Sequence, residues 1–262
     1  MNKFKFSIIV PNYNSGKYIR GCIESIISDQ YDNFELFIVD GKSLDDSHSI
    51  ILQYKDNAKV HWIKEPDRGI SNAFNLALNH CTWDFILYLW SDDYLYPGIL
   101  SKVNIFLNNI TNYSAPDFGK VNIFCDSINY YYSENRTEKR VYPTIDINRE
   151  NLIKYWTIIP LQSIFLNKEW IKSNKLDENY KYTMDYELYF RMIESQQIFL
   201  HLPEISNITW LWDNISCNNW NKWWFESLSA SNLRIKTLRD FLYSIRRWLL
   251  QYYFHKIFFP KW

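Results

Sequence analysis

The chain has 262 residues, of which 47% are hydrophobic, 22% charged and 19% aromatic, and its formal net charge at pH 7 is zero. This length suits one large α/β domain or a domain with an added subdomain, and the composition excludes an intrinsically disordered chain. The charge is unevenly spread, because residues 234–262 hold seven Lys or Arg and one acid, a net of +6. The remaining chain, with 22 basic and 28 acidic residues, therefore carries −6.

Cysteine usage and the N-terminus bear on the cellular compartment. The four cysteines stand singly, with neither the paired spacing of a zinc site nor the density of a disulfide framework. The N-terminal apolar run is too short for a signal peptide and lacks a small-residue cleavage site. No run approaches the roughly 20 apolar residues that cross a bilayer. We therefore expect a cytoplasmic protein that does not span a membrane, although it could act at the inner face of the cytoplasmic membrane.

Apolar strands alternate with amphipathic helices over the first 90 residues or so. The apolar runs predict strands at residues 7–10, 34–39, 60–63 and 85–90, and helical spacing predicts a helix over about 70–80. This rhythm predicts an α/β fold with a Rossmann-like, mostly parallel sheet flanked by helices. Beyond residue 111 the pattern loosens. There we expect a strand at residues 162–165, a helix from near Thr183 and a long helix over 234–262.

Polar residues follow three of the predicted strands. Residues 11–14 follow the first strand, Asp40 ends the second, and Asp92 and Asp93 follow the fourth. Parallel sheets bind ligands beyond the carboxyl ends of their strands, so we expect these groups to share one rim. Adjacent carboxylates at such a place can coordinate a hard divalent cation and hydrogen-bond a ribose or a water. Pairs of Asp also commonly begin helices or face solvent.

Four segments, in order, carry a resemblance to a known family. They are SIIVPNYNSGKYI, FELFIVDGKSLDDS, EPDRGISNAFNLAL and WDFILYLWSDD. Together they resemble the N-terminal half of glycosyltransferase family 2, whose members are inverting enzymes with the GT-A fold. The resemblance is strong over residues 5–110 and looser to residue 216. It implies a nucleotide-sugar-binding half at 1–110 and an acceptor-binding half at 111–216. The composition of the remaining residues predicts a basic aromatic helical tail at 217–262.

The resemblance also implies a donor site. Pro11, Asn12 and Tyr13 would line the pocket for the nucleotide base, and Asp40 would accept a hydrogen bond from that base, as an equivalent acid does with uracil in similar enzymes. A UDP-sugar is thus the favoured donor. Asp40 could instead be a solvated turn residue.

Two further features of the resemblance concern the metal and the diphosphate. Asp92 would hold the ribose or a metal-bound water, and Asp93 would ligate Mn or Mg. The segment EPDRG resembles a turn of a subgroup that builds bacterial surface polysaccharides, such as lipopolysaccharide or capsule. There Arg68 could neutralise phosphate charge and Gly69 permits the sharp entry into the next helix. Asn72 stands where the subgroup commonly has Asp, so the subgroup's preference for a donor sugar cannot be assigned to this chain.

Inverting transfer needs a base that deprotonates the acceptor hydroxyl. By its position Asp185 matches the family's catalytic acid at the start of a helix, and Glu187 is the nearest substitute and a candidate acceptor contact. An acid in the first helical turn is also favoured by the helix dipole alone. Gln162 lies in a strand that the family places beside the acceptor site. Residues 210–216 lack the Arg and His that relatives often carry near the diphosphate.

The basic aromatic tail has two open interpretations. Its apolar stripe and cations are typical of a helix lying in a membrane surface, but it could equally pack on its own domain or on a second subunit. No nucleic-acid-binding motif accompanies the basic residues. We expect an inverting, metal-dependent glycosyltransferase acting on a bacterial glycan or a lipid-linked acceptor. The alternatives are a catalytically inactive nucleotide-sugar-binding module and a membrane-associated adaptor.

Overall fold

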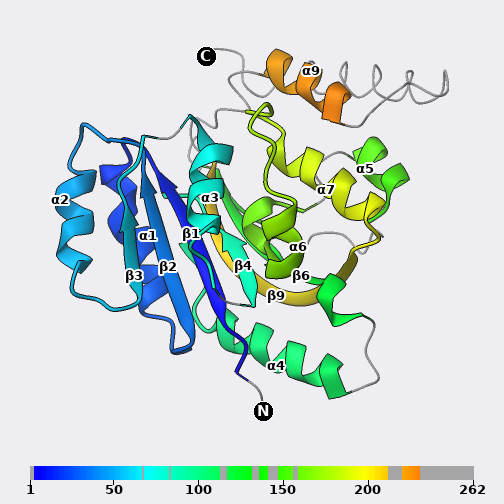
Figure 1. Cartoon of the computed structure of the whole chain (residues 1–262), viewed down its shortest axis with the longest axis horizontal. Coiled ribbons are helices and arrows are strands. Elements are labelled where there is room, and N and C mark those ends of the chain that lie inside the picture. The colour runs from blue at the N-terminus through cyan, green and yellow to red at the C-terminus, as the bar shows by residue number, and fades with distance from the viewer. Residues whose placement is uncertain are drawn as a thin grey trace.

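The computed structural model describes residues 3–66, 68–82, 84–112, 117–131, 136–140, 147–155, 159–211 and 220–230. Of the basic aromatic tail predicted at 217–262, only residues 220–230 are described, and the long helix predicted at 234–262 lies outside the described residues, so the two interpretations of the tail stay open. One mixed, nine-stranded sheet forms the centre of the molecule (Figure 1), in the order β3-β2-β1-β4-β8-β6-β9-β5 with β7 paired to β6. Within the described residues, no helix has both the length and the apolar character needed to cross a bilayer.

The N-terminal half of the sheet is parallel, as the sequence predicts. Its strands are β1 (Phe6–Asn12), β2 (Phe34–Asp40), β3 (Val60–Ile63) and β4 (Phe85–Tyr88). β1 lies between β2 and β4 and is parallel to both, while β3 forms the edge beside β2. β2 and β4 are buried at every position, which explains their continuous apolar runs, because such strands are covered on both faces.

The C-terminal half of the sheet departs from the parallel pattern. β8 (Ile164–Asn167) runs antiparallel to both β4 and β6 (Val121–Tyr131). The 14-residue β9 (Ile198–Leu211) pairs in parallel with β6, while β5 (Tyr94–Leu95) and β7 (Arg136–Arg140) add antiparallel edges. The strand predicted at 162–165 is displaced, because Leu161–Ser163 form a 3-10 turn and pairing starts at Ile164. Gln162 therefore lies in that turn and not in a strand.

Helices cover both faces of the sheet. One face packs against α1 (Gly16–Ile27), α2 (Ser47–Ile51) with the 3-10 turn Leu52–Tyr54, and α4 (Ile99–Asn112). The other face packs against α3 (Ile70–Leu78), α5 (Arg149–Tyr155), α6 (Lys168–Ser173) and α7 (Met184–Glu194). A short 3-10 turn, Phe118–Lys120, precedes β6, and α9 (Trp220–Ala230) packs beside α7. Alternate residues of β1 point to opposite faces, so Ile9 contributes to one core and Ile8 and Val10 to the other.

Candidate active site

A buried polar cluster joins the carboxyl ends of β1 and β2. Asn12 Nδ2 donates to Asp40 Oδ1 at 2.7 Å and to Ser43 Oγ at 3.1 Å. Ser43 Oγ donates to Asp40 Oδ1 at 2.6 Å, and His48 Nε2 of α2 contacts Asp40 Oδ2. Asp40 has no exposed surface, so it is not the solvated turn residue that the sequence left open. Both of its oxygens have protein partners, and its predicted contact with a base stays a prediction.

The loops around this cluster hold one buried polar atom without a partner among the described residues and one exposed ring. Asn12 Oδ1 is buried and has no hydrogen-bond partner among the described residues. Tyr13, by contrast, is 62% exposed. The loop bends at Asn14, whose φ of 51° lies in the left-handed region, and Asn14 Oδ1 accepts from the amide of Leu44 in the facing loop. Pro11 ends the buried run of β1, level with Val39 of β2. A flat ligand could thus meet an exposed ring and a buried acceptor.

Asp92 and Asp93 lie in the turn between β4 and β5. Asp93 is 1% exposed, and its backbone amide donates to the carbonyl of Trp90 at 3.0 Å. Asp92 is half-buried, and burial raises the pKa of its carboxyl above the ordinary value. Burial also raises the pKa of the Cys22 thiol in α1, and the negative charges of Asp93 and Asp92 add to this shift. The pair is therefore neither open to solvent nor at the start of a helix.

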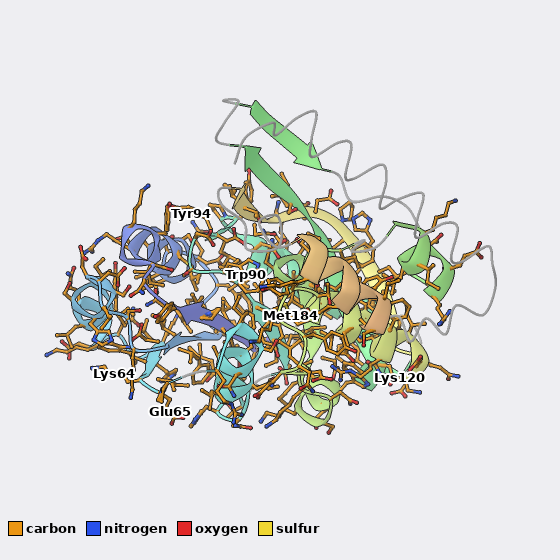
Figure 2. The ribbon with its side chains drawn as sticks, turned by 90° about the horizontal axis from the view of Figure 1, so that it is seen from above. Lys64, Glu65, Trp90, Tyr94, Lys120 and Met184 are labelled. Carbon is orange, nitrogen blue, oxygen red and sulfur yellow. The ribbon has the colours of Figure 1, made fainter. Side chains whose placement is uncertain are left out.

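A chain of hydrogen bonds connects Asp93 to the second half of the sheet. Thr209 Oγ1 of β9 donates to Asp93 Oδ2 at 3.3 Å. The same hydroxyl accepts from Gln162 Nε2 at 3.0 Å and from Asn207 Nδ2 at 2.8 Å. Gln162 Oε1 accepts in turn from Trp90 Nε1 at 3.2 Å. The structure thus brings Gln162 within two hydrogen bonds of Asp93, and Figure 2, which views this edge from above, labels Trp90 near its centre.

The acidic pair suits a divalent cation that shares its shell with a substrate. Among the described residues no group of three or more His, Cys, Asp or Glu side chains could hold a metal ion by itself. Mg²⁺ is usually held by one or two carboxylates together with substrate phosphates and water. Asp92 and Asp93 supply two neighbouring carboxylates at this edge, and both are wholly or partly buried. The residues present therefore fit such an ion.

Arg68 and Asn72 lie at the start of α3, which begins at the same edge of the sheet. Gly69 has a φ of 120°, a value that glycine adopts without strain. Arg68 Nη2 donates to Glu178 Oε2 at 2.8 Å, and Asn72 Nδ2 donates to Glu178 Oε1 at 2.9 Å. The hydrogen bond from Asn72 is the largest cause of a lowered pKa of Glu178. An Asp at position 72 would face Glu178 with a second carboxylate, which explains why the amide suits this chain.

The two predicted acceptor-side acids have different surroundings. Asp185 is the second residue of α7 and is partly exposed, and its Oδ1 accepts from the amide of Tyr186 at 2.8 Å. Glu187 is 8% exposed, and Arg191 binds both of its oxygens, at 2.6 and 2.8 Å. This bidentate ion pair gives Glu187 a structural role. It disfavours the predicted contact between Glu187 and an acceptor and leaves Asp185 as the candidate base.

Several residues of the site carry no signal in the sequence. Thr209 binds Asp93 and Glu178 binds Asn72, in each case across more than 100 residues of sequence. His48, in the helix that follows β2, contacts Asp40. Thr, Glu and His at such positions are ordinary surface or strand residues until the tertiary structure places them.

Comparison with known proteins decides the family. The model of glycosyl transferase family 2 matches residues 7–166, which is more than half of the chain. The chain belongs to glycosyl transferase family 2. The matched stretch contains the Asn12–Asp40 cluster, the Asp92–Asp93 turn and Gln162, whereas Asp185 lies beyond it. The predicted GT-A fold is confirmed by solved structures of glycosyltransferases.

Curated relatives of this chain are named as glycosyltransferases. A glycosyltransferase of Rickettsia prowazekii is 28% identical over 202 residues, covering 74% of this chain and 60% of the relative. The β-N-acetylglucosaminyltransferase TarS of Staphylococcus aureus is 33% identical over 108 residues, 40% of this chain and 19% of TarS. The chain thus spans about 60% of the Rickettsia protein and a smaller share of TarS.

Two solved structures show the same fold. The structure of S. aureus TarS with UDP-GlcNAc has a TM-score of 0.64 at 20% identity, covering 80% of this chain and 59% of that one. A mannosyltransferase of Pyrobaculum calidifontis with GDP-Man and Mn²⁺ has a TM-score of 0.61 at 14% identity, covering 87% and 65%. These identities are low, so the likeness concerns the fold alone.

Proposed function

We propose that this protein is an inverting glycosyltransferase that moves a sugar from a nucleoside diphosphate sugar to a hydroxyl of a bacterial glycan or a lipid-linked oligosaccharide. The observation that supports this most is the placement of two buried carboxylates, Asp40 and Asp93, at the carboxyl ends of the adjacent strands β2, β1 and β4. Ligands of open α/β sheets bind at this edge. Family membership favours the same reaction class.

The donor nucleotide would lie along this edge. Asn12 Oδ1 is a buried acceptor with no partner among the described residues, and it could accept a hydrogen bond from an N–H of the base. The exposed ring of Tyr13 could stack on the base. Asp40 would hold Asn12 in place through their 2.7 Å hydrogen bond. We favour a UDP-sugar, because the family resemblance implies one and because the TarS structure contains UDP-GlcNAc.

The diphosphate and its leaving group would lie near Asp92 and Asp93. These two residues would hold Mn²⁺ or Mg²⁺, and the ion supplies charge stabilisation to the departing diphosphate. The side chain of Arg68 is 78% exposed, so its guanidinium could leave Glu178 and bind a phosphate oxygen. Gln162 and Thr209 keep Asp93 in its orientation through their hydrogen bonds.

The acceptor hydroxyl would be activated by Asp185. Its carboxylate would take the proton as the acceptor oxygen attacks the anomeric carbon from the face opposite the diphosphate, a contribution of about 10²–10⁴-fold in rate. Asp185 sits at the N-terminal end of α7. The ion pair between Glu187 and Arg191 fixes the next turn of that helix.

A second candidate function is a nucleotide-sugar-binding module without catalysis. It is favoured by the absence of Arg and His from residues 210–216, a segment that is described only to residue 211. A role in membrane contact through residues 234–262 is a further proposal, based on sequence alone.

The experiment that separates these functions measures release of nucleoside diphosphate. A panel of UDP- and GDP-sugars is incubated with the protein, with and without Mn²⁺, and thermal stabilisation by each donor is recorded in parallel. We expect a UDP-sugar to stabilise the protein and to release UDP only with the metal. Asp93→Asn should lower release by at least ~10²-fold, whereas Asp56→Asn, at an exposed position, should not. Equal release by wild type and Asp93→Asn would refute the proposed site, and stabilisation without release would favour the binding module.

A further inference from the structure

The segment that leads into α7 is held in place from outside. Residues 174–183 connect α6 to α7 and end two residues before Asp185. On one side α3 binds this segment: Ser71 Oγ donates to the carbonyl of Tyr180 at 3.2 Å, and Asn75 Nδ2 donates to the carbonyl of Leu176 at 2.8 Å. The position of Asp185 therefore depends on contacts made by other elements.

On the other side, α9 reaches the last residues of the segment. Glu226 Oε2 accepts from the backbone amides of Lys181 at 3.0 Å and Tyr182 at 2.8 Å. The hydroxyl of Thr183 lies 3.5 Å from the same oxygen, and Ser229 Oγ is 3.3 Å from Tyr180 OH. Figure 1 shows α9 beside α7, and Figure 2 labels Met184, the first residue of α7, near the centre of the binding edge.

These contacts suit the N-terminal end of a helix. The first amides of a helix have no partners within it and attract negative charge. Thr183 stands at the N-cap of α7, and its side chain accepts no capping hydrogen bond. Glu226 supplies a carboxylate just outside the helix, where it accepts hydrogen bonds from the amides of Lys181 and Tyr182, which precede the N-cap, and from the hydroxyl of Thr183. Hydrogen bonds to a charged acceptor are stronger than neutral ones.

We propose that Glu226 is a positioning residue for Asp185, and that α9 thereby completes the acceptor side of the site. This inference rests on the proposed function, because it assigns Asp185 the role of base. α9 lies beyond residues 7–166, which the family model matches. The acceptor half of the site therefore extends into the C-terminal part of the chain. Glu226 acts through the backbone of residues 181–183 and not through contact with substrate.

Amide hydrogen exchange tests the positioning without any substrate. Three full-length variants are compared with wild type: Glu226→Ala, Glu226→Gln, which keeps an oxygen acceptor, and Lys222→Ala, an exposed position on the same helix. We expect the amide exchange rate of residues 181–187 to rise about tenfold in Glu226→Ala. In Glu226→Gln the rate should lie close to that of wild type, and in Lys222→Ala it should equal the wild-type rate. Unchanged exchange in Glu226→Ala would overturn the inference.

Kinetics separate a positioning role from a general loss of structure. With the UDP-sugar that wild type turns over and Mn²⁺, water takes the place of the acceptor hydroxyl as the group that Asp185 deprotonates. Glu226→Ala should then lower kcat for UDP release by up to ~10²-fold, the effect of a displacement of about 1 Å. Its Kd for UDP should stay within about twofold of wild type, and Glu226→Gln should recover kcat. A parallel loss of UDP affinity, or an unchanged kcat, would overturn the inference. If wild type neither binds UDP nor releases it, the proposed function fails instead, while the exchange result stands separately.

Discussion

The ion pair between Glu187 and Arg191 offers a prediction that can be worked out from the structure. Arg191 donates four hydrogen bonds: two to Glu187, one to the carbonyl of Asn174 at 3.0 Å and one to that of Lys175 at 2.9 Å. The Glu187 side chain is 10% exposed and that of Arg191 is 28% exposed. Arg191→Ala would leave the Glu187 carboxylate largely buried without its cation and would release the segment before Asp185 from α7.

The expected cost follows from the burial of the pair. Breaking a buried ion pair by removing one partner costs about 3–5 kcal/mol. Because water can reach Arg191, we expect the lower end, about 3 kcal/mol. For a chain of this size, 1 kcal/mol shifts Tm by about 2–4 °C, so Tm should fall by about 6–12 °C.

The assay is urea denaturation combined with a thermal melt. Lys102→Ala is the matched control, because Lys102 pairs with Glu204 at the surface, where the two side chains are 45% and 40% exposed. That variant should lose no more than about 1 kcal/mol. If Arg191→Ala loses no more stability than Lys102→Ala, the ion pair does not hold α7 to the segment before it.

Two further predictions concern the acidic turn and its support. The folded-state pKa of Asp92 is raised by burial, so its contribution to stability is greatest below the unfolded value of 3.8 and is lost as pH rises through the folded pKa. The Tm of Asp92→Asn should therefore lie above that of wild type at pH 7 and equal it near pH 3. Addition of UDP-sugar with Mn²⁺ should no longer raise the Tm of the variant. A Tm below that of wild type at pH 7 would contradict this prediction. Gly21→Ala should destabilise by about 1–3 kcal/mol despite better helix propensity, because a Cβ there would lie 2.6 Å from the Tyr94 ring. Urea titrations should show this cost vanish in a Tyr94→Ala background, and a persistent cost would exclude the clash.

Local patterns sufficed for the N-terminal half. Runs of apolar residues predicted most of β1 and β2 and all of β3 and β4, although β4 ends two residues before the predicted bound. They did so because a strand covered on both faces needs apolar side chains at successive positions. The same patterns failed for β6 and β9. Their pairing joins residues 121–131 to 198–211, with polar side chains such as Asn122 and Asn207 buried in hydrogen-bonded networks. No short window of sequence shows that such polar residues will be buried.

The candidate site divides in the same way. The sequence alone predicted that Asn12, Asp40, Asp92 and Asp93 lie at strand ends. It also predicted that they meet, because the carboxyl ends of parallel strands lie at one edge of a sheet. The resemblance to the family added Asp185.

The partners of these groups were decided only by the tertiary structure. Thr209 binds Asp93, Glu178 binds Arg68 and Glu226 binds the residues before α7. Each of these contacts joins elements far apart in the chain, and the identity of a hydrogen-bond partner depends on distances of a few ångströms that residue types do not encode. A sequence pattern therefore shows which groups reach the edge, whereas packing determines which atoms hold them there.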